Sequence, residues 1–221
     1  YWGRLDGTLD FLLLQQIRAF FAFDTIGPSE FDAFLRAHLN FFPAGFSLPS
    51  FLDNHDMNRF LWIVGGDTRR LKLAALFQFT LPHPPIIYYG TEAGLSQWRD
   101  LTYPDDSRRP EESRAPMPWG DSQDTSLVDF YRRLIALRRE LAPHWKGARI
   151  PLVTDEAGLY VTHLQRDGTR AIVALNRANA EQEILFNTEW NLNLCFATDK
   201  AVTFERDSLT LPPYGGAILN G

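Results

Sequence analysis

Two apolar segments of this chain are each followed by a polar loop and then by a helical pattern, and this repeat limits the fold more than any other feature. The first unit is an expected strand at 48–52 with a helix at 68–79, and the second is a strand at 86–89 with a helix that starts at Ser126. Strands that alternate with helices pair in parallel, because a parallel pair needs a long crossover connection. The sequence therefore predicts an α/β region, and its periodicity leaves open a barrel or a doubly wound sheet.

Two further helices are expected before the first strand. Apolar residues recur at helical spacing over 12–21, and a cleaner pattern of the same kind covers 29–42. Ser29 is the expected cap of the second of these helices, with Asp32 three residues later in a box-like arrangement. Ser126 is expected to cap the later helix in the same way.

From about Gly147 the pattern changes to a period of two, which is typical of strands. Asp167-Gly168 lies between two alternating runs and predicts a tight hairpin. Short, evenly spaced apolar runs continue to the end of the chain, as in a small antiparallel β-sandwich. The expected fold class is therefore α/β plus all-β, with domains at 1–145 and 146–221.

A polar cluster follows the first expected strand directly. Buried ionisable groups are costly unless they are paired or used, and active sites lie at the carboxyl ends of the strands in parallel barrels. The cluster is therefore a candidate functional site. A structural alternative stays open, in which the cluster contains turn residues and a buried pair of His55 with Asp56. Its members are Asp53, Asn54, His55, Asp56, Asn58 and Arg59.

Composition excludes several classes of protein. With 45% hydrophobic and 22% charged residues, the 221 residues have the profile of a globular chain. The net charge of −5, without a basic stripe, argues against nucleic acid as a partner. No apolar run reaches the roughly 18 residues that a membrane span needs, and the histidines show no metal-ligand spacing. The single cysteine, Cys195, excludes an internal disulfide and slightly favours a reducing, cytoplasmic compartment.

Three short motifs of this chain resemble motifs of one known family and occur in the same order. They are Phe-Leu-Asp-Asn-His-Asp at 51–56, Pro-Ile-Ile-Tyr-Tyr-Gly-Thr-Glu-Ala-Gly at 85–94 and Arg-Ala-Pro-Met-Pro-Trp at 114–119. They resemble, in this order, the strand-seven motif, the strand-eight motif and a landmark after strand eight in the α-amylase superfamily of glycoside hydrolases. With Arg59 three residues after Asp56, the chain has a His-Asp-x-x-Arg motif at 55–59 that resembles the one in the neopullulanase and cyclomaltodextrinase branch of that family.

The resemblance implies that the chain is the C-terminal portion of a (β/α)8 TIM barrel, from about strand 6 to helix 8, followed by an antiparallel β-sandwich domain. It implies that Asp56 is the catalytic carboxylate that stabilises the transition state. It also implies that four other residues bind the substrate, namely His55, Asn54, Arg59 and Arg114.

The loop at 95–125 departs from the branch at Pro110, where the resemblance implies an aspartate that assists the arginine of the landmark. Asp105 or Asp106 is the expected substitute. Trp98 and Trp119 either stack on sugar or anchor the loop, and anchoring is slightly favoured. Glu92 is expected to pair with a neighbouring cation.

The implied function is that of a retaining α-glucan glycosidase or a transglycosylase, with an α-glucan oligosaccharide or polysaccharide as its partner. Retaining enzymes use two carboxylates as nucleophile and acid/base, and in this family both precede strand six. We therefore expect this chain to be inactive by itself and to self-associate through its open barrel edges. The chain opens at Tyr1, so a targeting signal would not be visible. No cofactor is expected here, and the resemblance places any calcium site in the N-terminal part of the family's barrel.

Two alternatives belong to other classes. The first is a non-catalytic sugar-binding or regulatory module that uses the same fold, and the two upstream carboxylates would be absent from its gene. The second is a metabolic barrel enzyme with unrelated chemistry, which would show a phosphate-binding glycine-rich loop after strand seven or eight. Gly65-Gly66 is a weak candidate for such a loop.

Overall fold

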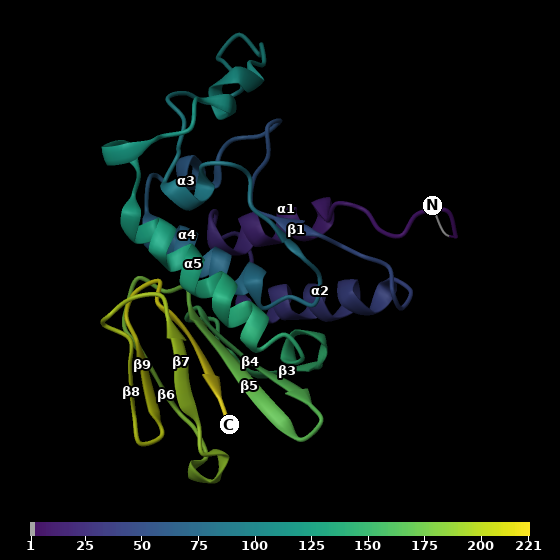
Figure 1. Cartoon of the computed structure of the whole chain (residues 1–221), viewed down its shortest axis with the longest axis vertical. Helices are drawn as coiled ribbons and strands as arrows, with labels where there is room; N and C mark the ends of the chain where they lie inside the picture. The colour runs from purple at the N-terminus through teal and green to yellow at the C-terminus, as the bar shows by residue number, and fades with distance from the viewer. Residues whose placement is uncertain (1–2) are drawn as a thin grey trace.

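The computed structural model describes residues 3–221. Figure 1 shows helices and long loops at one end of the molecule and two groups of strands at the other, with the chain passing between them after α5. The order of elements follows the expected change from an α/β region to an all-β region. Tyr1 and Trp2, the first residues of the predicted domain 1–145, lie outside the described residues.

The first two helices are α1 (Phe11–Phe21) and α2 (Pro28–Phe41), and each buries an apolar face. The prediction that Ser29 caps α2 was wrong. The cap is Gly27, which makes no side-chain hydrogen bond, and Pro28 takes the first helical position. Proline suits that position, because its missing N–H would have no partner there and its φ is already helical.

Two short strands, β1 (Ser50–Phe51) and β2 (Pro85–Ile86), pair in parallel as expected. An isolated parallel bridge between Gly7 and Ser47 adds a further parallel contact just before β1. The second strand is shorter than the predicted 86–89 segment, and its side chains are not fully covered. Among the described residues β2 has a single strand neighbour, so one of its edges is open.

Helix α3 (Phe60–Ile63) follows the first strand, and α4 (Thr68–Phe79) begins and ends where the sequence predicted. The buried Gln78 of α4 holds the strand pair together: its Nε2 donates to the Ser50 carbonyl at 2.9 Å and to the Ile86 carbonyl at 3.1 Å. One side chain of the helix therefore joins both strands.

The expected helix after the second strand is α5 (Thr125–Glu140), but its cap differs from the prediction. Asp124, not Ser126, is the cap, and its carboxylate accepts from the Ser126 N–H at 3.0 Å. A carboxylate is favoured over a hydroxyl there, because it also interacts with the positive end of the helix dipole. Short 3₁₀ helices flank α5, namely η1 (Thr91–Ala93), η2 (Pro110–Arg114), η3 (Gly120–Ser122) and η4 (His144–Lys146).

The C-terminal region contains two antiparallel sheets. The predicted hairpin at Asp167-Gly168 is confirmed, and both residues have positive φ angles, 51° and 81°, as a two-residue hairpin turn requires. A short helix, η5 (Thr188–Trp190), lies between two of the strands. The first sheet has the order β3 (Ala148–Thr154), β4 (Leu159–Arg166), β5 (Thr169–Asn176), β10 (Gly216–Asn220), β7 (Asn193–Ala197), and the second has the order β6 (Gln182–Leu185), β9 (Ser208–Leu211), β8 (Thr203–Glu205).

The three central strands of the larger sheet, β4, β5 and β10, are buried on both faces. Side chains such as Val161 pack toward the smaller sheet, whereas Tyr160 on the other face joins the core formed by the helices, where it lies beside Phe20. Arg177, at the end of β5, donates to the carbonyls of Phe20 at 3.1 Å and Ile26 at 2.6 Å. One hydrophobic core therefore crosses the predicted boundary at 145/146, and the division into two domains stays a prediction.

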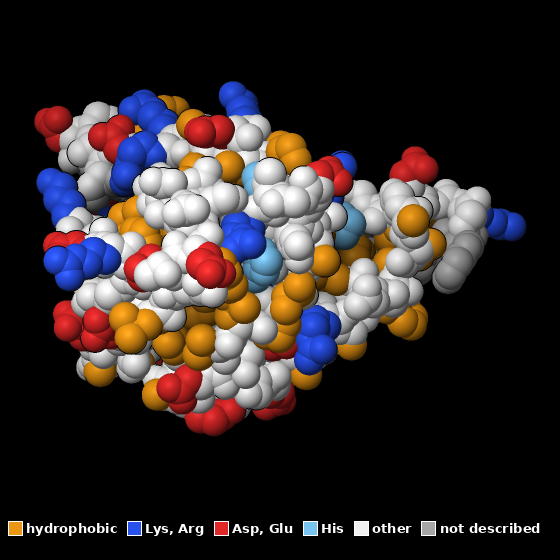
Figure 2. Space-filling model, turned by 90° about the horizontal axis from the view of Figure 1, so that it is seen from below, with side chains coloured by type: hydrophobic (Ala, Val, Ile, Leu, Met, Phe, Trp, Pro, Cys, Tyr) orange, Lys and Arg blue, Asp and Glu red, His pale blue; other side chains and the backbone are white. Residues whose placement is uncertain are grey.

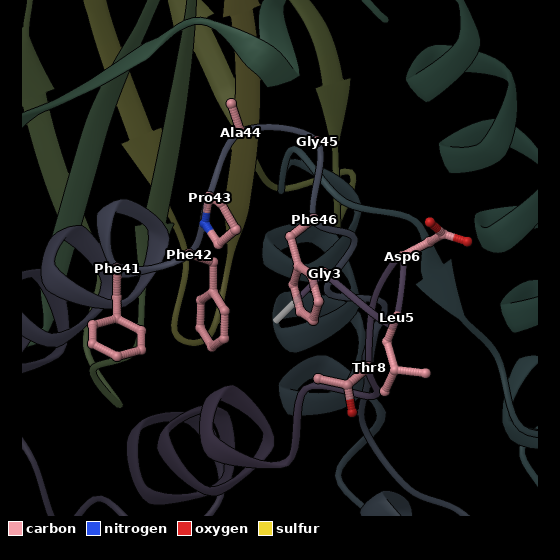
Figure 3. A pocket seen from close by; sticks show the side chains of 10 residues that line it. All are labelled: Gly3, Leu5, Asp6, Thr8, Phe41, Phe42, Pro43, Ala44, Gly45 and Phe46. Carbon is pink, nitrogen blue, oxygen red and sulfur yellow. The ribbon is translucent and has the colours of Figure 1, made fainter. Parts of the chain in front are cut away.

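The surface has mixed character. Figure 2 shows charged groups of both signs interspersed with hydrophobic side chains on the face seen from below. An apolar cavity of about 390 Å³ lies between the N-terminal segment and the 41–46 segment (Figure 3). In this cavity the rings of Phe42 and Phe46 stack with their centroids 5.5 Å apart. Across residues 3–221, none of the helices has the length and apolar character needed to cross a bilayer.

Candidate active site

Asp53, the first polar residue after β1, is only 2% exposed and connects the end of the strand to its surroundings. Its carboxylate accepts hydrogen bonds from the Phe60 N–H at 2.8 Å and from the Thr91 hydroxyl at 3.1 Å. Burial raises the pKa of Asp53, although these hydrogen bonds and the charge of Arg59 act in the opposite direction. Asp53 is therefore the anchor of the polar cluster, a role that its position in the sequence did not reveal.

The next residues form a tight turn that projects two side chains outward. The Asn54 Oδ1 accepts from the Asp56 N–H at 2.8 Å, which is the local hydrogen bond that asparagine commonly makes in turns. The side chains of His55 and Asp56 are 60% and 64% exposed, and the His55 Nε2 lies 3.2 Å from the Asp56 Oδ2. The structural alternative of a buried pair was therefore wrong about burial, although the two side chains do meet.

Arg114, from the loop after β2, reaches the same turn. Its Nη2 lies 3.1 Å from the Asp56 Oδ1, and its Nε donates to the His55 carbonyl at 3.0 Å. Arg108 donates to the Asp56 carbonyl at 3.0 Å, and the Ser113 hydroxyl donates to the His55 carbonyl at 3.2 Å. The fold thus brings together Asp56, His55 and Arg114, although 58 residues separate Asp56 from Arg114 in the sequence.

Arg59, which the resemblance assigns to substrate binding, lies inside the fold. It is 0% exposed, its Nε donates to the Ser113 carbonyl at 2.9 Å, and its Nη1 donates to the Tyr89 carbonyl at 2.7 Å. Its guanidinium also lies over the Tyr88 ring, 4.0 Å from the centroid. In this position Arg59 joins the turn to the later loop, and its burial does not support direct contact with a sugar.

A second set of polar residues, which the sequence analysis did not single out as a group, fixes the loop to the turn. The buried Gln97 accepts from the Arg59 N–H at 2.7 Å through its Oε1 and donates to the Asn58 Oδ1 at 2.7 Å through its Nε2. Asn58 also accepts from the Leu101 N–H at 3.0 Å and donates to the Asp100 Oδ2 at 3.0 Å. The only sequence signal for this network was that Asn58 belongs to the polar cluster.

Three expectations for the loop and the η1 helix before it were wrong. Trp98 and Trp119 do not anchor it, since their side chains are 84% and 75% exposed. Glu92 makes no ion pair with a cation of the described chain, and its Oε2 is buried without a hydrogen-bond partner there. The expected substitute aspartate is also not found beside Arg114, whose carboxylate partner is Asp56 itself.

The arrangement combines one exposed carboxylate with a cation and an imidazole at the end of a parallel strand. Such a carboxylate can stabilise positive charge that develops on a bound molecule, and the flanking donors can bind hydroxyl groups. No three metal-binding side chains gather at one place in the part of the chain that the structure describes. The expectation that no metal or cofactor is needed stays a prediction.

Comparison with protein families matches residues 15–134 to the model described as alpha amylase, catalytic domain. Alpha-amylase 2 of Dictyoglomus thermophilum is 36% identical over 220 residues, which cover 99% of this chain and 37% of the relative. Neopullulanase 2 of Thermoactinomyces vulgaris is 32% identical over 228 residues, with coverage of 98% and 37%. The chain therefore spans 37% of the length of these curated relatives.

Two solved structures superpose on nearly the whole of this chain. The cyclic alpha-maltosyl-(1→6)-maltose hydrolase of Arthrobacter globiformis superposes with a TM-score of 0.78 at 26% identity, covering 98% of this chain and 44% of that protein. The alpha-amylase of H. orenii superposes with a TM-score of 0.76 at 22% identity, covering 98% and 49%, and shares the fold.

Proposed function

The chain belongs to the α-amylase family, and from this premise we propose that it is the C-terminal part of a retaining α-glucan glycoside hydrolase. In this proposal residues 3–145 form the last part of a (β/α)8 barrel, and a β-sandwich domain follows. The names of the relatives, which include an alpha-amylase, a cyclomaltodextrinase and a neopullulanase, support α-linked glucose oligomers or polymers as the substrate.

The observation that carries the proposal is the exposed Asp56 carboxylate at the end of β1, held between His55 and Arg114. Hydrolysis of a glycosidic bond passes through a transition state with oxocarbenium-ion character. A fixed carboxylate favours that positive charge over the neutral ground state and so lowers the barrier. His55 and Arg114 would bind hydroxyl groups of the sugar beside the scissile bond, and Asn54 would hold the turn that presents them.

The proposal assigns the nucleophile and the acid/base to a segment outside residues 1–221. Its support is that the chain spans 37% of its curated relatives and carries no second carboxylate motif of the family. We expect residues 1–221 alone to release no sugar from maltoheptaose. Turnover by this chain alone would contradict that part of the proposal and leave the family membership unchanged.

The test of Asp56 uses the full-length protein and maltoheptaose. Asp56→Asn should lower kcat by about 10²-fold or more, because the charge is lost where the transition state needs it. Asp105→Asn is the matched control, since Asp105 is an exposed loop carboxylate that bonds to Ser107. Equal turnover by wild type and Asp56→Asn would refute the role of Asp56, and binding of maltoheptaose without turnover by wild type would favour the sugar-binding module instead.

A further inference from the structure

Trp98 is the most exposed large hydrophobic residue of the described chain, and it lies in the loop that is fixed to the Asp56 turn. Its indole is 84% exposed, whereas the neighbouring Gln97 is buried. Large apolar side chains are normally removed from water, so an indole that the fold holds outward is a candidate binding surface.

The backbone on both sides of Trp98 is held in place. Before it, Gln97 bonds to the Arg59 N–H at 2.7 Å, and after it the Arg99 carbonyl accepts from the Gln97 Nε2 at 2.6 Å. The same Gln97 Nε2 donates to the Asn58 Oδ1, and Asn58 accepts from the Leu101 N–H. Exposure of Trp98 is therefore not a sign of a loose loop, because the segment that carries it shares hydrogen bonds with the turn that carries Asp56.

Trp119, the other exposed tryptophan of this loop, is not bonded to the Asp56 turn in the same way. Trp119 is also exposed, at 75%, but the hydrogen bonds beside it remain within its own turn: Ser122 donates to the Trp119 carbonyl and Gln123 to the Pro118 carbonyl. Trp98, by contrast, lies between Gln97 and Leu101, which both bond to Asn58. Asn58 is two residues after Asp56, so of these two tryptophans Trp98 is the one whose segment is bonded directly to the Asp56 turn.

We propose that Trp98 stacks on a glucose ring of an α-glucan bound at Asp56 and so sets a preference for longer oligosaccharides. A pyranose ring has a flat apolar face of C–H groups that an indole covers well, while its hydroxyl groups lie at the edge and remain available for hydrogen bonds. This inference rests on the proposed function, since it assigns a specificity residue to the same site.

The experiment compares maltoheptaose with the short substrate 4-nitrophenyl α-maltoside in the full-length protein. Trp98→Ala should raise KM for maltoheptaose about tenfold, as the loss of one aromatic contact implies, and leave kcat within about twofold. KM for the short substrate should not change. Trp98→Phe should recover part of the affinity, because a phenyl ring still stacks.

Trp119→Ala is the control, because Trp119 is also an exposed tryptophan of the same loop. An unchanged KM for maltoheptaose in Trp98→Ala would overturn the inference, as would an equal increase in Trp119→Ala. These outcomes are distinct from failure of the proposed function, in which the wild-type protein would hydrolyse neither substrate.

Discussion

Asp53 and Asp56 are close neighbours in one turn, yet the structure gives them opposite environments. Asp53 is enclosed and bonded to Phe60 and Thr91, whereas the Asp56 carboxylate is open to solvent and paired with Arg114. A buried carboxylate with specific donors supports the fold, and an exposed one at a strand end is available to a ligand. The two aspartates of this turn therefore differ in environment, since one is enclosed by the fold and the other is open to a ligand.

This contrast predicts different effects of the two substitutions on stability. Asp53→Ala should lower the free energy of unfolding by about 2–4 kcal/mol, because it leaves the buried Phe60 N–H and the Thr91 hydroxyl without their acceptor. Asp56→Ala should cost less than about 1 kcal/mol, as expected for an exposed ion pair. Urea unfolding of both variants measures the difference, and equal losses would contradict it.

The residue types of the candidate site could be predicted, but their exposure could not. The motif at 51–56 predicted Asp56 and His55, and the structure places both on the surface with Arg114 beside them. Arg59 belongs to the same short run but is buried by groups from a distant segment, the carbonyls of Tyr89 and Ser113. Burial of this kind depends on tertiary packing, which a local pattern does not contain.

At the scale of elements, the helices were predicted better than their caps. Helix α4 lies where its apolar pattern predicted, but serine was expected at two caps where the structure has Gly27 and Asp124. Several residues near a helix start can serve as the cap, and the choice depends on where the preceding loop directs the chain. The pattern of apolar residues therefore determined the helices, and the loops determined their first residues.

Asp67 caps α4 and should make its stability depend on pH. Asp67 accepts from the Arg69 N–H at 2.9 Å, and Asp67→Ala should cost about 1 kcal/mol at neutral pH. Hydrogen bonds from the Arg69 side chain lower the pKa of Asp67 in the folded protein. The stabilisation is therefore present above the unfolded-state pKa of about 3.9 and is lost as the pH falls through the lower folded-state value.

Urea unfolding of Asp67→Ala and wild type at pH 7 and at about pH 2 measures this effect. The difference in free energy of unfolding between the two proteins should shrink at the lower pH. Asp129→Ala is the control, because Asp129 is an exposed carboxylate within α5 that pairs with Arg132 and caps no helix. A difference that stays constant with pH would show that the carboxylate charge of Asp67 does not contribute.

At the scale of the whole molecule, the open strand edge predicts self-association of residues 1–221. Strand β2 has one described strand neighbour, and two apolar side chains are exposed in this region, those of Ile86 within the strand and of Tyr89 three residues later. Unpaired edges with apolar side chains favour pairing with another chain. Sedimentation should show dimers or larger species at micromolar concentration, and Ile86→Lys should reduce them. A wild-type monomer under these conditions would contradict the prediction.

The change from α/β to all-β structure near Gly147 was visible in the sequence, because a helical period gives way to a period of two. The joining of the two regions was not visible. The Tyr160 hydroxyl donates to the Asp32 Oδ1 at 3.0 Å, and the Arg149 Nη2 donates to the Thr80 carbonyl at 2.7 Å. These contacts connect residues far apart in the chain, and no local periodicity describes such pairs.

Arg177 also has a consequence for the order in which the protein forms on the ribosome. The carbonyls of Phe20 and Ile26, at the end of α1 and in the loop after it, receive their donor from a residue about 150 positions later. While the nascent chain is shorter than this, those carbonyls depend on water, and the Phe20 ring lacks the guanidinium that covers it at 4.6 Å. Helix α1 is therefore completed only after β5 has been synthesised, so a translation product that stops before residue 177 should lack these hydrogen bonds and be degraded by quality-control proteases.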